Sequence, residues 1–431
     1  MTPHGRRESD GFAPRPPLPV AHSVGVDYIR RRMRRIPLVL LPAACLAFTA
    51  MALAPAKSAA DGRPRRALMD TETRAAIERG LRFLVRTQNA DGSWTCDAGN
   101  KVNEEYKVFD GGQNIHHVGI TALAILAFLA AGNEPGRGPH GQVLDRAVDF
   151  IASCVQPDGY VQASETRMYS HAFATLALAE VYGMSRKSDL RERLQSAVEF
   201  TVRCQNQTGG WRYKPFTVDS DMSVTVCQVV ALRAAKNVGI KVPQGTIDRA
   251  LGYVISSAIV QDEAPGERRG GFKYQPASTR FNRSSFALTA AGLTTLFQAG
   301  LYDDGMLESY IEKRGLSIRP FPRIGDSVSF MRREYDSMRR AYGEHYFYYY
   351  GNYYAAQAMY NVGGLAPEIW EGWYDRVRRD LLDLEHRSGP GDGATDESFW
   401  VSNVGSTHTY ATSTALLILS IPFDYLPIHQ R

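Results

Sequence analysis

Two patterns of apolar residues alternate along the chain. In the first pattern, apolar residues recur every three or four positions, and a Gly-rich turn follows that contains Gln and ends in an aromatic residue. This spacing predicts a helix with one buried face, and the Gly residues end the helix because they accept positive φ. Copies occupy residues 76–94, 147–160 and 196–213, and a fourth copy keeps Gly270, Gly271 and Phe272.

The second pattern is a segment rich in small residues and almost free of charge. A helix that is apolar nearly all round is buried, so these segments predict inner helices. Six copies occur, at residues 116–132, 170–183, 221–235, 284–300, 351–364 and 408–422.

Alternating half-exposed and buried helices predict an all-α fold with two concentric layers, an (α/α)6 toroid. The repeat length of about 50 to 70 residues is typical of helix-pair arrays. An open solenoid is the alternative, but both ends of the array are apolar, which favours closure. The fifth outer helix is expected to begin near Met306, residues 316–345 to form an insertion with an extra helix, and the last outer helix to cover residues 369–386.

Residues 1–60 have the organisation of an export signal. A basic run at residues 30–35 precedes an apolar stretch and a tail of small residues, which is the order that a secretory signal requires. Met33 is a possible true start, and cleavage after Ala56 or Ala60 would satisfy the small-residue rule. An uncleaved membrane anchor is the alternative. We therefore expect an exported protein whose toroid covers residues 61–431, with membrane association through the N-terminal segment as an option.

The formal net charge of +5 comes from this leader. The first 60 residues hold nine Lys and Arg but three Asp and Glu, and the remainder holds 41 basic and 42 acidic residues. The basic isoelectric point is therefore no evidence for nucleic-acid binding, and we expect no nucleic-acid partner.

Four cysteines follow the leader, namely Cys96, Cys154, Cys204 and Cys227. An even number permits two disulfides in an oxidising compartment, and buried free thiols are an equally good alternative.

The turns of the first pattern read Gln-x-x-Asp-Gly-Ser-Trp and Gln-Asn-x-x-Gly-Gly-Trp. They resemble the QW repeats of the squalene-hopene cyclase and protein prenyltransferase β-subunit superfamily, and the resemblance covers about residues 70–431. It implies that Gln88 and Gln205 bind the backbone at a helix end and that Trp94 and Trp211 stack over them. These residues would be scaffold. The end of the chain resembles single-toroid bacterial members, most of which have no assigned activity.

The same resemblance suggests an acid for catalysis. Cyclases of this superfamily protonate an alkene or epoxide with the middle residue of an Asp-x-Asp-Asp motif, and the matching residues here are Asp219, Asp221 and Met222. Asp221 would be the acid and Asp219 its neighbour, provided that Asp221 stays protonated. Met222 in place of the third Asp weakens this hypothesis. An Asp before an apolar helix is more commonly an N-cap.

A metal site is not expected. The prenyltransferase branch binds zinc through Asp, Cys and His, and Asp221, Cys227 and His408 are the available residues, but the family spacing Asp-x-Cys is absent. No phosphate-cradling loop or hydrolase elbow occurs either. We therefore predict no metal and no cofactor.

Several polar and aromatic residues lie near the starts of the inner helices. His117, His171 and His408 would share one rim of the ring, and Tyr349 and Tyr353 come from a Tyr-rich run. Titratable groups beside an aromatic cavity predict a ligand-binding site. Helix capping by the histidines and packing of the tyrosines are the alternatives.

Two function classes follow. In the first, the toroid binds an apolar small molecule, a peptide or a glycan in its central cavity without catalysis. In the second, it is an acid-initiated terpenoid cyclase, an isomerase or lyase, with Asp221 as proton donor. A single toroid and an incomplete acid motif favour the binding protein.

Overall fold

A computed structural model describes residues 69–96, 115–164, 166–185, 187–261, 268–276, 283–388, 396–402 and 408–429. The expected export signal in residues 1–60 lies outside these ranges. Within them, no helix combines the length and the hydropathy that a membrane span requires.

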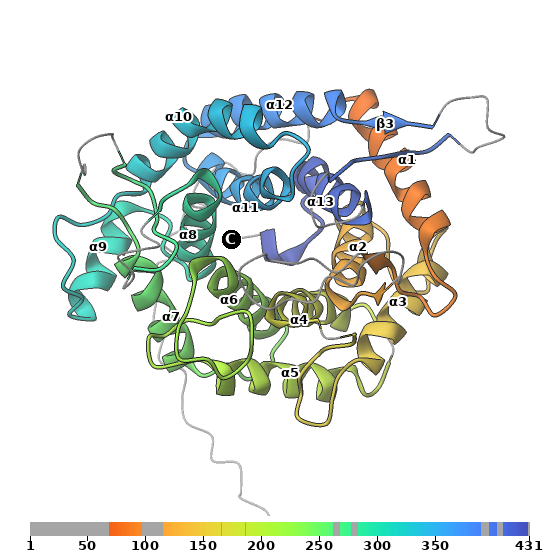
Figure 1. Cartoon of the computed structure of the whole chain (residues 1–431), viewed down its shortest axis with the longest axis horizontal. Coiled ribbons are helices and arrows are strands. Elements are labelled where there is room, and N and C mark those ends of the chain that lie inside the picture. The colour runs from red at the N-terminus through yellow and green to blue at the C-terminus, as the bar shows by residue number, and fades with distance from the viewer. Residues whose placement is uncertain are drawn as a thin grey trace, which may run out of the picture. The chain divides into compact units, whose positions relative to one another are not determined.

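Six helices form a closed inner ring, as predicted (Figure 1). Each contacts the next in chain order, and the last contacts the first, so the array is a ring and not an open solenoid. Nearly every residue of these helices is buried, which explains their uncharged, small-residue sequences. They are α2 (Val118–Ala130), α4 (Met168–Tyr182), α6 (Met222–Asn237), α8 (Phe286–Gln298), α11 (Tyr346–Gly363) and α13 (His408–Ser420).

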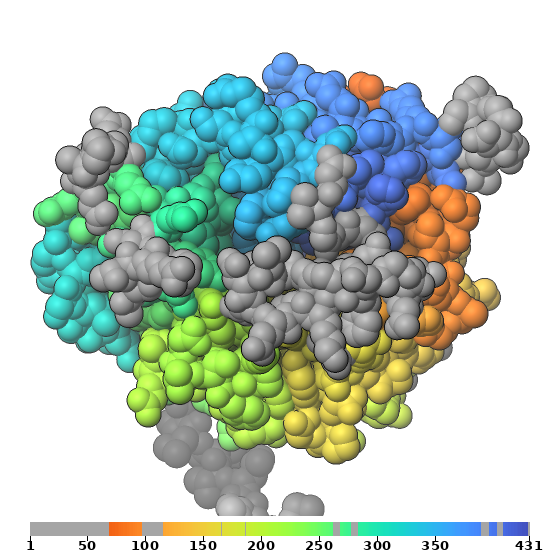
Figure 2. Space-filling view, viewed as in Figure 1, coloured from red at the N-terminus to blue at the C-terminus, as the bar shows by residue number. Residues whose placement is uncertain are grey.

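Further helices surround this ring (Figure 1), and their side chains pack into an outer layer that is orange, yellow, green and blue in the space-filling view (Figure 2). Their buried residues recur at three- and four-residue spacing on the face that meets the inner ring. The fold is therefore the predicted (α/α)6 toroid. The outer helices are α1 (Thr71–Thr87), α3 (Gly141–Ser153), α5 (Leu190–Cys204), α7 (Gln244–Ser256), α10 (Ile324–Tyr342) and α12 (Pro367–Asp383).

The fifth outer helix differs from the prediction. The helix near Met306, α9 (Asp304–Lys313), buries only two residues, whereas α10 contacts both α8 and α11 and takes the place in the outer ring. The insertion therefore contains the outer helix, and α9 is the extra one. The cause lies in the amphipathic pattern, because α10 buries six residues on one face and α9 has too few to join the wall.

Short strands and turns connect the helices. Strand β1 (Thr95–Cys96) pairs antiparallel with β2 (Ile115–His116), and β3 (His386–Arg387) pairs in the same way with β4 (Ser398–Phe399). Two 3-10 helices, η2 (Ile421–Phe423) and η3 (Pro427–His429), follow α13.

Each Gly-rich turn packs its backbone against the next outer helix. Gly92, Gly159, Gly209 and Gly270 all have φ near +90°. A Cβ atom at any of them would overlap a backbone carbonyl oxygen of the following outer helix. Glycine is required at these positions both for the left-handed conformation and for the close approach.

The Gln and Trp residues of the turns have the scaffold role that the resemblance implies. The Gln88 side-chain amide donates to the carbonyl oxygens of Gly92 and Val143 at 3.0 and 2.8 Å, so it joins its own turn to α3. Gln205 makes the same pair of bonds to Gly209 and Thr246. The indole N–H groups of Trp94, Trp211 and Trp400 each donate to a carbonyl near the end of the preceding outer helix.

The seam, where α12 meets α1 and the ring closes, has an ion pair in place of the contact between Gln and the next outer helix. At the first and third turns, Arg146 and Arg249 donate to the side-chain oxygens of Gln88 and Gln205. At the seam, Glu385 takes the place of the Gln, and Arg79 of α1 binds both of its carboxylate oxygens at 2.8 and 2.9 Å. Both side chains are buried, so α12 and α1 are joined by a desolvated ion pair.

The four cysteines Cys96, Cys154, Cys204 and Cys227 are free and buried. The disulfide alternative is therefore absent from this structure. Burial raises the pKa of the Cys227 thiol to about 12, so it stays protonated.

We predict that Gly209→Ala destabilises the protein by at least about 2 kcal/mol more than Gly239→Ala. Both glycines have positive φ, so both variants carry backbone strain, but a Cβ atom at Gly239 meets no atom within 4 Å. The difference isolates the clash with the α7 backbone. Chemical denaturation measures it, and equal losses would show that the close approach is unimportant.

Arg79→Ala is expected to cost about 3 kcal/mol, because the buried Glu385 loses its bidentate cation, although it keeps the contact with Arg387 at 3.1 Å. Arg137→Ala is the matched control, since its partner Glu134 is exposed, and it should cost less than about 1 kcal/mol. Urea titration of both variants tests this. A loss for Arg79→Ala no larger than that of the control would contradict the proposed role of the seam.

Candidate functional site

The inner helices all begin at one end of the ring, which we call the rim. The backbone N–H of the residue that ends each turn donates to a side chain in the first turn or so of the next inner helix. This side chain is Thr121 in α2, Thr225 in α6, Thr289 in α8 and Thr412 in α13. Because the same bond recurs, the helix starts share the rim and the helix ends share the opposite side, the far end.

Asp221 is the N-cap of α6 and is completely buried at the rim. Its Oδ1 accepts hydrogen bonds from the backbone N–H of Val224 at 2.9 Å and from the hydroxyl of Ser223 at 2.5 Å. Its Oδ2 lies 3.0 Å from the Arg212 guanidinium. These contacts stabilise the ionised carboxylate, whereas a proton donor must keep the neutral acid.

Arg212 links both predicted carboxylates. Its Nε lies 3.1 Å from Oδ2 of Asp219, whose side chain is 53% exposed. The guanidinium also stacks on the ring of Tyr213 and donates to the hydroxyl of Tyr274 at 3.0 Å. The structure therefore brings Asp219 and Asp221 together, but the Arg212 guanidinium lies between them. Its positive charge offsets the effect by which a second carboxylate would favour the protonated form of Asp221.

Aromatic side chains meet across the axis of the ring below this cluster. Helices α4 and α11 are opposite each other in the ring order. Even so, Tyr169 and Tyr350 are 6.5 Å apart between ring centroids, and Phe173 and Tyr353 are 6.0 Å apart. We call these four residues the aromatic bridge. It fills part of the central space that the sequence predicted as a cavity, and we use the term recess for the interior of the ring between the bridge and the rim.

The hydroxyl groups of the aromatic bridge bind α6. Tyr169 donates to the Ser223 hydroxyl at 2.6 Å, and Tyr350 donates to the Ser223 carbonyl oxygen at 3.1 Å. Burial raises the pKa of both tyrosines well above the usual value, so both stay neutral. Tyr169, Phe173 and Tyr350 nevertheless keep partly exposed surface, as does Tyr410 of α13. Exposed aromatic faces inside a ring of buried helices form the wall of the recess.

Two of the three histidines that were predicted to bind a ligand, His117 and His171, form hydrogen bonds within the protein instead. His117 caps α2 through an Nδ1 that accepts from the Ile120 N–H, and burial lowers its pKa to about 4. His408 is exposed at the start of α13 and lies against Phe399, so it remains a candidate at the rim.

His171 is a correction to the predicted site, because it is fully buried in the scaffold. It is the fourth residue of α4, the position that Thr121 and Thr225 hold in α2 and α6. Its Nδ1 accepts from the Val161 N–H, and its Nε2 lies 2.8 Å from the Thr201 hydroxyl. Val161 stands where the other turns carry Trp or Phe, and the imidazole fills the space that the smaller side chain leaves.

Tyr349 and Tyr353 differ in position. Tyr349 is buried and packs against Tyr348 and Tyr410, which places it behind the recess wall. Tyr353 belongs to the aromatic bridge. Tyr169 and Tyr274 could not be predicted as site residues, because only the closed ring brings their segments together, and Arg212 could not, because only the fold of its turn brings it to Asp221.

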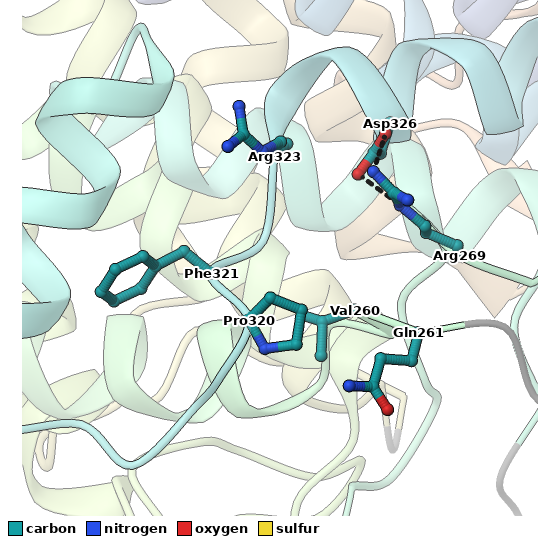
Figure 3. Close-up of a pocket in the computed structure, with 7 residues that line it drawn as sticks. All are labelled: Val260, Gln261, Arg269, Pro320, Phe321, Arg323 and Asp326. Carbon is teal, nitrogen blue, oxygen red and sulfur yellow. Dashed lines mark hydrogen bonds and ion pairs between the residues drawn. The ribbon is translucent and has the colours of Figure 1, made fainter.

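A metal centre and a surface pocket are the remaining kinds of site that the described residues could form. No group of three or more His, Cys, Asp and Glu that could hold a metal occurs among them. A shallow pocket lies elsewhere, on the outer side at the start of α10 (Figure 3). Asp326 binds Arg269 there through two contacts of 2.8 and 3.1 Å and neutralises it.

At the far end, the segment after α13 enters the ring, where the 3-10 helix η3 contacts α6 and α11. The side-chain amide of Gln298 donates to the Ile428 carbonyl oxygen at 2.9 Å, and the Glu180 carboxyl accepts from the Ile428 N–H. Glu180 is 5% exposed, and burial raises its pKa to about 8.

Comparisons with known proteins agree with the fold. No protein-family model matches the sequence. A drimenyl diphosphate synthase of Streptomyces showdoensis is 28% identical over 216 residues, 49% of this chain and 34% of the synthase. Another from Streptantibioticus cattleyicolor is 28% identical over 166 residues, 37% of this chain and 27% of that synthase. The chain thus spans about a third of the length of these relatives.

Solved structures share the toroid at low identity. An alpha-1,6-mannanase of Salegentibacter sp., an inactive variant in complex with alpha-1,6-mannotetrose, has a TM-score of 0.52 at 10% identity and covers 81% of this chain and 99% of its own. A type II terpene cyclase from Scytonema has a TM-score of 0.45 at 13% identity, with 81% and 96% covered. The chain therefore has the α/α toroid fold and resembles terpene synthases in part of its sequence.

We predict that Glu180→Gln changes the pH dependence of stability. Glu180 has an unfolded pKa of 4.5 and a folded pKa of about 8, so the native state binds the extra proton and loses stability as the pH rises from 4.5 to 8. Burial lowers the pKa of His429 to about 4 and raises the pKa of Tyr353 well above its usual value, so both side chains are neutral in that window.

As the pH rises from 4.5 to 8, the free energy of unfolding of Glu180→Gln should increase relative to that of the wild type by up to about 1.4 kcal/mol per pH unit, a few kcal/mol in total. Unfolding free energies measured at pH 5, 6, 7 and 8 provide the test. Parallel profiles for the two proteins would rule out a buried, neutral Glu180.

Proposed function

We propose that this protein is a binding toroid whose recess at the rim holds an extended, hydroxylated ligand with apolar faces, an oligosaccharide. The observation that carries the proposal is the aromatic bridge, which brings partly exposed Tyr and Phe faces from opposite helices into one recess. Aromatic faces with a few polar groups beside them are typical of binding sites for such ligands.

The polar groups around the recess match hydroxyls better than a hydrocarbon. The exposed Asp219 carboxylate accepts hydrogen bonds, and Arg212 beside it donates them. Tyr hydroxyls line the same region. An all-apolar ligand would remove water from the Asp219 carboxylate and the Arg212 guanidinium without offering them a hydrogen bond, which costs free energy.

The second candidate is the acid-initiated terpenoid cyclase, which the similarity to drimenyl diphosphate synthases favours. It would make the protein an isomerase or lyase with Asp221 as donor. Two features oppose it. Arg212 and the N-cap bonds hold Asp221 as a carboxylate, and the aromatic bridge occupies the place where a folded polyene would have to lie.

We also propose that the protein acts outside the cytoplasm, on the strength of the basic, apolar and small-residue regions in residues 1–60. N-terminal sequencing of the protein from its native host tests this. A mature start between residues 57 and 61 supports export with cleavage, and a retained leader in a cytoplasmic fraction contradicts it.

The binding proposal predicts that Tyr169→Ala weakens oligosaccharide affinity by about tenfold or more, because it removes one stacking face. Tyr182→Ala is the matched control, since Tyr182 is also partly exposed on α4 but lies at its other end, and its affinity should not change. Binding to malto-, cello- and manno-oligosaccharides is measured by calorimetry. If none of the three series binds the wild type, the proposal is wrong.

The same preparation distinguishes the cyclase. Incubation with squalene and with linear prenyl diphosphates is expected to give no cyclic product from the wild type or from Asp221→Asn. A cyclic product that the wild type forms and Asp221→Asn does not form would establish the cyclase in place of the binding protein. Circular dichroism checks that the variant keeps its helix content, since Asn still caps a helix.

A further inference from the structure

Two polar side chains stand out at the far end of the ring. The buried Asn361 of α11 donates to the Gln357 carbonyl oxygen of its own helix there, whereas Glu180 of α4 and Gln298 at the end of α8 are buried and bind outside their own helices. They belong to helices that are not neighbours in the ring. Both bind one residue, Ile428: Glu180 accepts from its N–H and Gln298 donates to its carbonyl oxygen.

The side chains of the same segment fill apolar space inside the ring. Leu426 and Ile428 are almost completely buried and belong to the main hydrophobic core. The 3-10 helix η3 contacts α6 and α11. Four inner helices therefore surround this short segment, two through its backbone and two through packing.

Recognition of the N–H and C=O groups of one residue by side chains is how proteins hold a peptide main chain, while pockets for its side chains supply selectivity. Packing of apolar side chains alone does not require a polar pair such as Glu180 and Gln298. Desolvation of a carboxyl group at this position costs stability, and Oε2 of Glu180 has no hydrogen-bond partner among the described residues. An aliphatic residue would fill the space at lower cost, so the polar pair points to recognition.

We propose that the far end of the ring is a peptide-binding site, occupied in this structure by the chain's own segment Leu426–His429, which it holds reversibly. The ligand class is a short peptide with two aliphatic side chains two residues apart, at the positions of Leu426 and Ile428. The site is separate from the recess at the rim, and the proposal does not depend on what the recess binds.

The first experiment uses the chain ended after Tyr425 and a fluorescent peptide with the sequence of residues 424–431. The shortened chain should bind the peptide saturably, and the full chain should bind it at least about tenfold more weakly, because its own segment occupies the site. Ile428→Ala in the peptide, or Gln298→Leu in the protein, should each lower the affinity by about tenfold or more. The control Gln244→Leu changes an exposed Gln and should have no effect.

A folded shortened chain that binds no peptide would overturn the proposal. A second experiment needs no truncation and covers the case in which the shortened chain does not fold. In the intact protein, amide hydrogen exchange at Ile428 should be at least about tenfold faster than at Leu417 in α13, through opening of the segment alone. Exchange of both amides at one rate, with the denaturant dependence of global unfolding, would show a permanent core segment and contradict the proposal.

Discussion

The contact on which the rest of this structure depends is the approach of each Gly-rich turn to the backbone of the next outer helix. At Gly92, Gly159, Gly209 and Gly270 the main chains are so close that no side chain fits between them. The neighbouring Gln and Trp then bind backbone carbonyls on both sides of the contact. Because the turn leads directly into an inner helix, the same contact that spaces the outer wall also fixes where each inner helix begins.

Departures from the repeat are compensated locally. In the second copy, Val161 replaces the Trp, and His171 replaces the Thr that binds the turn, so one larger side chain offsets one smaller one. At the seam, Glu385 replaces the Gln, and its contact with the Arg of the next helix becomes a buried ion pair. His171 was predicted as a ligand-binding residue, but its contacts, like those of Glu385, are those of the scaffold.

The fold could be predicted from the sequence because its signals are local and repeated. Helix faces, Gly-rich turns and uncharged inner segments each depend on residues within about 20 positions of one another. The candidate site could not be predicted to the same degree. Tyr169 and Tyr350 are far apart in sequence and meet only because α4 and α11 lie across a closed ring. Arg212 changes the chemistry of Asp221, yet it reads as an ordinary surface residue beside a Trp. The prediction that the fifth outer helix begins near Met306 was wrong for the same reason, since only tertiary contacts show that α10 and not α9 belongs to the outer ring.

The division of the molecule into a rigid scaffold, a recess at the rim and an occupied far end requires that the turns be as stable as the ring that they hold. The most direct measurement is native-state hydrogen exchange of the Trp94 and Trp211 amides, which bind the hydroxyls of Thr121 and Thr225. The account predicts that both exchange only with global unfolding, as slowly as amides in the middle of α2 and α6. Exchange through low-energy local opening at either turn would contradict it, since the turns would then not hold the ring.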